Sequence, residues 1–379
     1  MMNARWAVVG IAVALLIVSL GALAQQDWAA IEEAARAEGQ VVIYSVSSRM
    51  ENIVQDFKDK YGVDIVWYDM ESSDQVEKFR REYAAGVSEV DVLYGNHEPD
   101  LVGEFLPAGM VEAFVPSTSA PFLDPNEMEP FLVQRWSSRV LIYNAALNPD
   151  GPPIDSLWDL TQPEWKGMVL APDPLSSVQG AVYQTIINHP DEMAAAYERE
   201  FGEPITLSPG MKDAGEEWFY RFIQNEPVTM SSTSKVAKGV GDVEQTGTPP
   251  IGFTTFSKLR KYGLGCGSVE DGYYPTGYAS VPMLDLDPVF GVAYPTVLAL
   301  SSTAPHPNAG KLLIRYLVEE GYWPWNEIGD YASRSDFEAL QVKFFGIPPF
   351  DEVKLWIADS EYIYSNANNY LEFYLSIAP

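Results

Sequence analysis

The run Glu38-Gly39-Gln40-Val41-Val42-Ile43-Tyr44-Ser45 combines a glycine, four apolar residues and a polar exit. Valine, isoleucine and tyrosine fit a pleated, half-buried surface, so residues 41–44 predict a β-strand. Before this run, residues 27–38 carry apolar side chains at helical spacing and predict an amphipathic helix that ends at Gly39. The first folded unit of the chain is therefore a helix, a strand and a polar loop.

The same alternation continues along the chain. Apolar residues at helical spacing over 53–61 and 72–83 predict two helices, and runs at 63–68 and 90–94 predict two more strands. Strand and helix in alternation are typical of an α/β fold with a mainly parallel sheet, in which ligands bind beyond the carboxyl ends of the strands. The loops at those ends are 45–49, 69–73 and 95–99.

The N-terminus reads as a secretory leader. Arg5 supplies the positive charge, residues 7–24 are apolar or small, and Ala22-Leu23-Ala24 is a small-x-small cleavage pattern. We expect a signal peptide at 1–24 and no stable membrane insertion after cleavage. The alternative is an uncleaved anchor, because the apolar stretch is just long enough to span a bilayer.

Composition limits the function classes. The chain has 379 residues, more than one hydrophobic core usually organises, so two lobes are expected. A net charge of −29 disfavours nucleic acid as a partner, since phosphate binding needs concentrated Lys and Arg. The acidic excess is interpreted as a solvated surface, with a cation-binding role as the alternative. Cys266 is the single cysteine and can form no intramolecular disulfide.

Later segments suggest where the chain passes between lobes. Residues 139–143 predict a strand that crosses between the lobes, and 290–300 form another apolar segment. The helical pattern at 309–319 follows. The expected divisions are a first lobe at 25–138, a second lobe at 139–280, a return to the first lobe at 281–318, and C-terminal helices at 319–379 that pack on the lobes.

Serines follow three of the predicted strands. Ser176 and Ser177 come after an Asp-Pro turn at a helix start, where hydroxyls and free backbone N–H groups can bind an anion or simply cap the helix. Ser47-Ser48-Arg49 and Ser72-Ser73 repeat this arrangement. Three such turns facing one cleft favour a small, polar ligand rich in oxygen atoms.

Metal and catalytic motifs are weaker. Asn96-His97-Glu98 offers an imidazole and a carboxylate, but His189 and His306 lie far away in sequence, so no multi-histidine metal site is predicted. The Tyr273-Tyr274 pair could bind ferric iron, although its Gly and Pro neighbours favour an aromatic surface loop. No nucleophile, zinc-protease or phosphate-loop motif is present, so an enzyme is the weaker hypothesis.

Several stretches together resemble a known family. They are Val42-Ile43-Tyr44-Ser45, Asp91-Val92-Leu93-Tyr94, Leu157-Trp158-Asp159-Leu160, Trp165-Lys166-Gly167 and Ala304-Pro305-His306-Pro307. Over residues 38–336 the chain resembles the extracellular solute-binding proteins of ABC importers, in the branch that includes the ferric-iron-binding proteins.

The resemblance implies a two-lobed periplasmic-binding-protein fold of type II, with a strand hinge that closes on ligand. It also implies a periplasmic location, and a permease and an ATPase as partners. By this likeness Ser176 and Ser177 would hold an anion, and Tyr294 would line the cleft. Thr254 and Thr255 stand near where iron-binding members carry adjacent tyrosines, which argues against ferric iron.

The sequence is therefore interpreted as a monomeric solute-binding protein without a cofactor or a bound metal, whose ligand is a phosphate- or carboxylate-bearing organic solute. Ferric iron is the runner-up, and a polyamine follows if the negative charge is concentrated in the cleft. A secreted enzyme on a two-lobed scaffold and a receptor that signals to a membrane sensor are the rivals from other classes. The expected ligand-binding residues are Ser47, Ser48, Arg49, Ser72, Ser73, Asn96, His97, Ser176, Ser177, Thr254, Thr255 and Tyr294.

Overall fold

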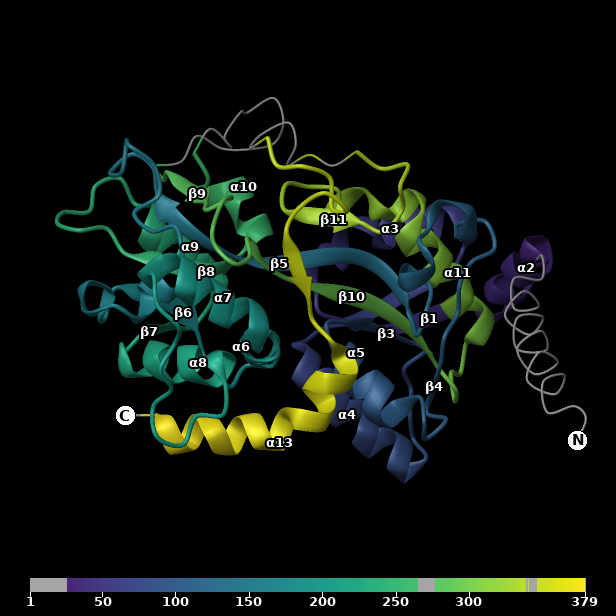
Figure 1. Cartoon of the computed structure of the whole chain (residues 1–379). Coiled ribbons are helices and arrows are strands. Elements are labelled where there is room, and N and C mark those ends of the chain that lie inside the picture. Colours follow the sequence, from purple (N-terminus) through teal and green to yellow (C-terminus); the bar gives the residue numbers. More distant parts are fainter. Residues whose placement is uncertain (1–25, 265–276, 339, 341–345, 379) are drawn as a thin grey trace, which may run out of the picture.

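The computed structural model describes residues 26–264, 277–338, 340 and 346–378 of the chain. The expected leader at 1–24, Cys266 and the Tyr273-Tyr274 pair lie outside these residues. The helices and strands form two lobes side by side, and two long strands run from one lobe into the other (Figure 1). Within the described ranges, no helix is both long enough and apolar enough to cross a membrane.

The first lobe is built on three parallel strands, with β1 between the other two. The helices that precede these strands end at Gly39, Gly62 and Gly86, which all adopt the left-handed conformation that glycine accommodates without strain. The glycines therefore mark the helix ends that the sequence predicts. The elements are α2 (Trp28–Glu38), β1 (Gln40–Ser45), α3 (Glu51–Tyr61), β2 (Asp64–Asp69), α4 (Ser72–Ala85), β3 (Val92–Gly95), α5 (Glu98–Asp100), the π-helical turn η2 (Leu101–Phe105) and β4 (Val111–Glu112).

Two long antiparallel strands join the lobes, β5 (Leu132–Asn144) and β10 (Gly291–Ser301). They pair from Gly291 opposite Val140 to Leu298 opposite Leu132. In the first lobe β10 pairs with β3, and in the second lobe β5 pairs with β8 (Ile251–Thr255). One continuous sheet with the strand order β2-β1-β3-β10-β5-β8-β6-β7 results, so the hinge is made of strands, as the sequence predicts.

The second lobe repeats the plan of the first. Its strands β6, β7 and β8 are parallel, and β9 pairs with the far end of β5. Helices cover both faces of this part of the sheet (Figure 1). The elements are β6 (Val169–Pro172), α6 (Ser177–Ile187), α7 (Pro190–Phe201), α8 (Ala214–Gln224), β7 (Val228–Met230), α9 (Thr233–Gly241), α10 (Leu259–Tyr262) and β9 (Ser280–Pro282).

The C-terminal part of the chain touches both lobes. Strand β12 adds to the edge of β10, and α13 then runs beneath the two lobes, packing on α5 and η2 of the first and on α6 and α8 of the second (Figure 1). The Ser360 hydroxyl donates to Glu98 Oε2 at 2.6 Å, and the Tyr370 hydroxyl donates to the Pro174 carbonyl at 2.9 Å. The elements are α11 (Pro307–Val318), the 3₁₀ turn η8 (Glu320–Trp325), β11 (Asp330–Ala332), β12 (Leu355–Ile357) and α13 (Ser360–Ile377).

The apolar core is continuous on one face of the hinge and interrupted on the other. On the first face, Trp136 and Val140 of β5 belong to a cluster that reaches into both lobes. On the second face, Leu132 belongs to the core of the first lobe and Leu141 to the core of the second. Between these two cores β5 carries polar side chains, so this face of the hinge is the place to look for a ligand site.

Candidate functional site in the cleft between the lobes

Three side chains of β5 lie on this interrupted face. Arg135, Ser137 and Arg139 alternate along the strand, and alternate residues of a strand share a face. Ser137 is paired with Asp330 of β11, and its hydroxyl donates to Asp330 Oδ1 at 2.8 Å. Arg139 is paired with Thr255 at the carboxyl end of β8. Side chains from both lobes therefore meet at the middle of β5.

Five basic side chains gather here, and we call Arg49, Arg135, Arg139, Lys258 and Arg260 the basic cluster. Arg49 comes from the loop after β1, while Lys258 and Arg260 follow β8. The whole chain has only 24 Lys and Arg against 53 Asp and Glu, so five cations in one place run against its composition. A ligand that needs positive charge would find it here.

Two carboxylates compensate part of this charge. Glu327 forms ion pairs with Arg49 from the first lobe and, at 2.9 Å, with Arg260 from the second. Asp330 lies 3.4 Å from Arg49 and 3.7 Å from Arg135. Burial raises the pKa of Glu327 to about 7, although the guanidinium groups beside it lower it in part. Glu327 therefore links the two lobes through arginines.

Arg139 and Lys258 are compensated less, since neither forms an ion pair within the described part of the chain, and Asp330 and Glu327 attract Lys258 only at longer range. Arg139 is only 5% exposed; its Nη1 donates to Thr255 Oγ1, and its guanidinium lies 6.0 Å from the Tyr294 ring centre. Burial lowers the pKa of Lys258 to about 8, and repulsion by Arg260 and Arg49 adds to this effect. Buried charge without a partner is costly, so an anion would stabilise this arrangement.

Two polar side chains of α6 extend the cleft site into the second lobe. Gln179 and Tyr183 are fully buried neighbours, and their amide and hydroxyl groups have no hydrogen-bond partner outside this pair among the described residues. Burial raises the pKa of Tyr183, while the neighbouring Gln179 and Arg139 oppose the shift. Native proteins rarely leave such groups unpaired, so these two are available to a ligand.

The structure places the serines of the sequence hypothesis elsewhere. Ser176 is exposed and its hydroxyl donates to the Asp173 carbonyl at 2.7 Å, and Ser177, the first residue of α6, is also exposed. Ser47 Oγ accepts a hydrogen bond from Trp325 at 3.0 Å, and Ser48 begins the 3₁₀ turn after it. These hydroxyls serve local turns and packing.

The remaining sequence-predicted residues divide between the cleft and the core. Ser72 Oγ accepts from the Asn96 backbone N–H at 3.0 Å, Ser73 is exposed, and Asn96 Nδ2 donates to Thr296 Oγ1 at 2.8 Å on β10. Thr254 Oγ1 donates to a backbone carbonyl near the start of α9 and does not share the face of Thr255. Of the predicted set, the structure gathers Arg49, Thr255 and Tyr294 around β5.

His97 lies apart from the basic cluster. It is 2% exposed, its Nε2 is 3.1 Å from Gln75 Oε1, and burial lowers its pKa to about 3. The imidazole is therefore neutral at ordinary pH and adds no charge to the cleft. The described part of the chain holds one group of three possible metal ligands, Asp155, Asp159 and Glu200, which lies in the second lobe away from the hinge.

Sequence reasoning missed most of the basic cluster. Arg135 and Arg139 sit in a strand that is buried along its whole length, and a charged residue in a buried strand is a signal that could have been used. Gln179 gives the same signal on a buried face of α6. Lys258 and Arg260 had no such signal, because they lie in a short helical turn whose direction depends on the tertiary fold.

No family model matches the chain, and no curated protein matches it. Among solved structures, iron-bound HitA from Pseudomonas aeruginosa matches with a TM-score of 0.66 and 17% identity, covering 90% of this chain and 99% of HitA. Apo ferric ion-binding protein A from Pasteurella haemolytica matches with a TM-score of 0.65 and 15% identity over 89% of this chain and 98% of its own.

A third similar structure holds an organic ligand. The periplasmic binding protein AfuA from Actinobacillus pleuropneumoniae, with exogenous fructose-6-phosphate bound, matches with a TM-score of 0.62 and 17% identity, covering 90% of this chain and 98% of AfuA. At these identities the likeness is one of fold. The chain thus has the two-lobed fold of these binding proteins, as the resemblance in its sequence predicts.

Proposed function

We propose that this chain is the solute-binding protein of an ABC importer and that it holds a small anionic organic solute between its lobes. The observation that carries this proposal is the basic cluster, in particular Arg139 and Lys258. Neither forms an ion pair among the described residues, although Asp330 and Glu327 attract Lys258 at longer range. In a chain of net charge −29, a group of basic side chains in the cleft is best explained by the binding of an anionic ligand. A phosphate or carboxylate group is the complementary ligand.

The arrangement suggests how binding would be coupled to closure. Arg49 belongs to the first lobe, whereas Lys258 and Arg260 belong to the second, so one anion between them bridges the lobes. Glu327 now provides that bridge. A ligand whose negative charge is more concentrated than that of the Glu327 carboxylate would compete with Glu327 for the same guanidinium groups. It would also add contacts to Arg139, Gln179 and Tyr183.

The location and the partners of the protein are proposed from its N-terminal leader and its two-lobed fold. The protein acts in the periplasm after removal of residues 1–24, as a monomer that delivers its solute to a permease driven by an ATPase. In this proposal residues 25–138 and 281–318 form the first lobe, 139–280 form the second, and 319–379 pack on the lobes. The protein carries the solute without chemical change.

Ferric iron is the weaker candidate. A trivalent cation would be repelled by the basic cluster. In addition, Thr254 and Thr255 occupy the positions where the resemblance would require tyrosines. The fold likeness to iron-bound HitA does not outweigh these residues, because fold alone does not fix the ligand.

The test is to identify what the purified mature protein carries. We expect mass spectrometry of the released small molecules to find an organic anion. When this anion is added back to the ligand-free protein, the melting temperature of the protein should rise by mass action. Arg139→Gln and Lys258→Gln should each weaken binding by roughly tenfold or more. Lys235→Gln removes the same charge from an exposed position and should leave the affinity unchanged. Stoichiometric iron without an organic anion would overturn the proposal.

A further inference from the structure

A separate cavity of about 990 Å³ lies on the opposite face of the hinge from the basic cluster. Trp136 of β5 and Tyr331 of β11 are paired and line it, and they alternate with Ser137 and Asp330, which point to the cleft. The C-terminal segment closes one side through Phe350 and the start of α13. This volume is typical of sites for drug-sized organic molecules.

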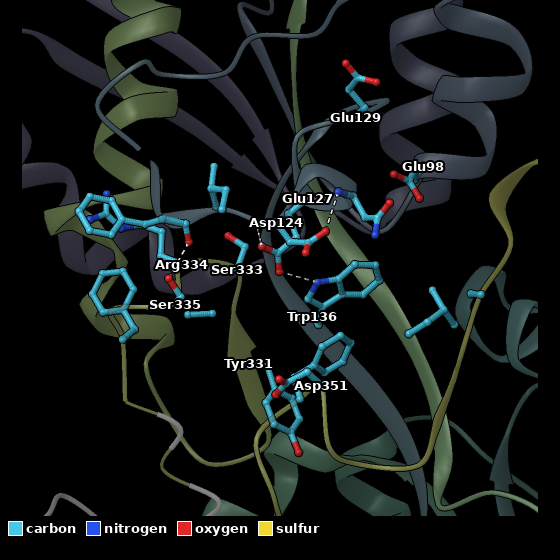
Figure 2. Close-up of a pocket in the computed structure, with 18 of the residues that line it drawn as sticks. Glu98, Asp124, Glu127, Glu129, Trp136, Tyr331, Ser333, Arg334, Ser335 and Asp351 are labelled. Atoms are coloured by element: carbon cyan, nitrogen blue, oxygen red, sulfur yellow. Dashed lines mark hydrogen bonds between the residues drawn. The ribbon is translucent and has the colours of Figure 1, made fainter. Parts of the chain in front are cut away.

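The floor of the cavity is aromatic (Figure 2). The Trp136 indole stacks on Phe350 with ring centres 5.2 Å apart and planes 18° apart, and Tyr331 lies 5.2 Å from the same ring. The faces of these rings carry negative partial charge, which attracts cations and gives anions no binding energy.

Two carboxylates face the cavity from its edge. Glu98 and Glu127 are each 9% exposed, and neither forms an ion pair among the residues that the structure describes. Glu98 accepts a hydrogen bond from Ser360, and Glu127 accepts one from the Trp136 indole N–H at 3.1 Å. Burial raises the pKa of both, for Glu127 to about 7. A cation nearby would favour their charged forms.

Arg334 is the one basic residue that the described part of the chain contributes to the cavity wall, and it is already neutralised. Its guanidinium pairs with Asp336 at 2.8 Å and lies over Phe122, 4.6 Å from the ring centre. Figure 2 shows it on the far side of the cavity from Glu98 and Glu127. The lining therefore presents acidic groups without a basic partner among the described residues, beside aromatic faces.

We propose that this cavity is a second ligand site, and that it binds an organic cation with an ammonium group on an apolar or aromatic body. The ammonium group would lie near Glu98 and Glu127, and the apolar body would pack on Trp136 and Phe350. The ammonium and the aromatic rings attract each other, and the carboxylates add direct charge complementarity. The site lies outside the cleft and does not depend on the function proposed above.

The experiment is calorimetric titration of the full mature chain with two cations and their neutral analogues. Tyramine is compared with 4-ethylphenol, and choline with 3,3-dimethylbutanol. We expect at least one cation to bind roughly tenfold or more tightly than its neutral analogue. Glu98→Gln, which keeps the shape of the side chain, should remove most of this difference, whereas the exposed Glu203→Gln should leave it intact.

The outcomes separate the two sites. Binding of a cation that survives Arg139→Gln and is lost in Glu98→Gln supports the second site, whatever ligand the cleft holds. If neither cation binds, or if the neutral analogues bind equally well, the inference is wrong while the proposal for the cleft stands. Because Glu127 also caps a turn, Glu98→Gln and Phe350→Leu are the variants to compare, with their melting temperatures measured first.

Discussion

At the scale of single residues, Arg139 shows a conflict between the stability of the ligand-free protein and the proposed binding of an anion. Its guanidinium is buried with Thr255 and the Tyr294 ring as neighbours, but no carboxylate among the described residues balances it. Replacing a buried, unbalanced charge by an apolar side chain of similar volume is often stabilising, while the loss of charge removes what the ligand needs. The two effects have opposite signs and can be measured separately.

We therefore expect Arg139→Met to raise the stability of the ligand-free protein, by about 1 kcal/mol, and to abolish anion binding. Urea unfolding of the ligand-free protein measures the first effect, and titration with the released solute measures the second. Arg135→Met is the matched control on the same strand. Because Arg135 contacts Asp330, its replacement should lower the stability of the protein. A less stable Arg139→Met protein would contradict this account.

The residues also show what the sequence could and could not predict about the site. Arg49 was expected from its place after a predicted strand, and Thr255 and Tyr294 were expected from the family resemblance. All three lie around β5. Ser176 and Ser177 satisfied the same rule, yet the Ser176 hydroxyl serves the turn before α6 and Ser177 is exposed, whereas Gln179, two residues further along, is buried. Which side of a helix start faces the partner lobe is a tertiary property that local sequence does not encode.

At the scale of elements, the long and strongly patterned segments were predictable and the short ones were not. The strands β1, β2 and β10 and the helices α3, α4 and α11 follow apolar residues with the expected spacing, and the structure confirms them. β11 and β12 have three residues each and take their place by pairing with β5 and β10. Such strands depend on partners that are distant in sequence, so periodicity cannot reveal them.

Helix α13 offers a test of element packing. A Cβ added to Gly103 in η2 would come within 2.0 Å of the Tyr364 ring of α13, so Gly103→Ala must push the helix away. We expect a loss of about 1–3 kcal/mol in urea unfolding, because overpacking a tight contact has a cost of this size. Gly277→Ala meets open space and should change stability little. Equal effects in the two variants would show that α13 packs loosely at this point.

At the scale of the whole molecule, charge dominates. A net charge of −29 makes the folded state repel itself, and salt screens that repulsion within about 10 Å at 0.1 M. We expect the melting temperature at pH 7 to rise by about 5 °C between about 0.05 and 0.5 M NaCl. At pH 4, where many carboxylates are protonated, the same salt step should have a smaller effect. An equal rise at both pH values would point to a cause other than charge repulsion.

The C-terminal segment gives the molecule a third connection between its lobes. β5 and β10 alone would let the lobes separate through small changes in a few backbone torsions. With α13 packed on α5 of one lobe and α6 of the other, opening also requires one of these helix contacts to break. For the solute proposed above, the residence time would then be governed by the undocking of a helix, so exchange should be slower than in a two-lobed protein of equal affinity that has only two crossings between its lobes.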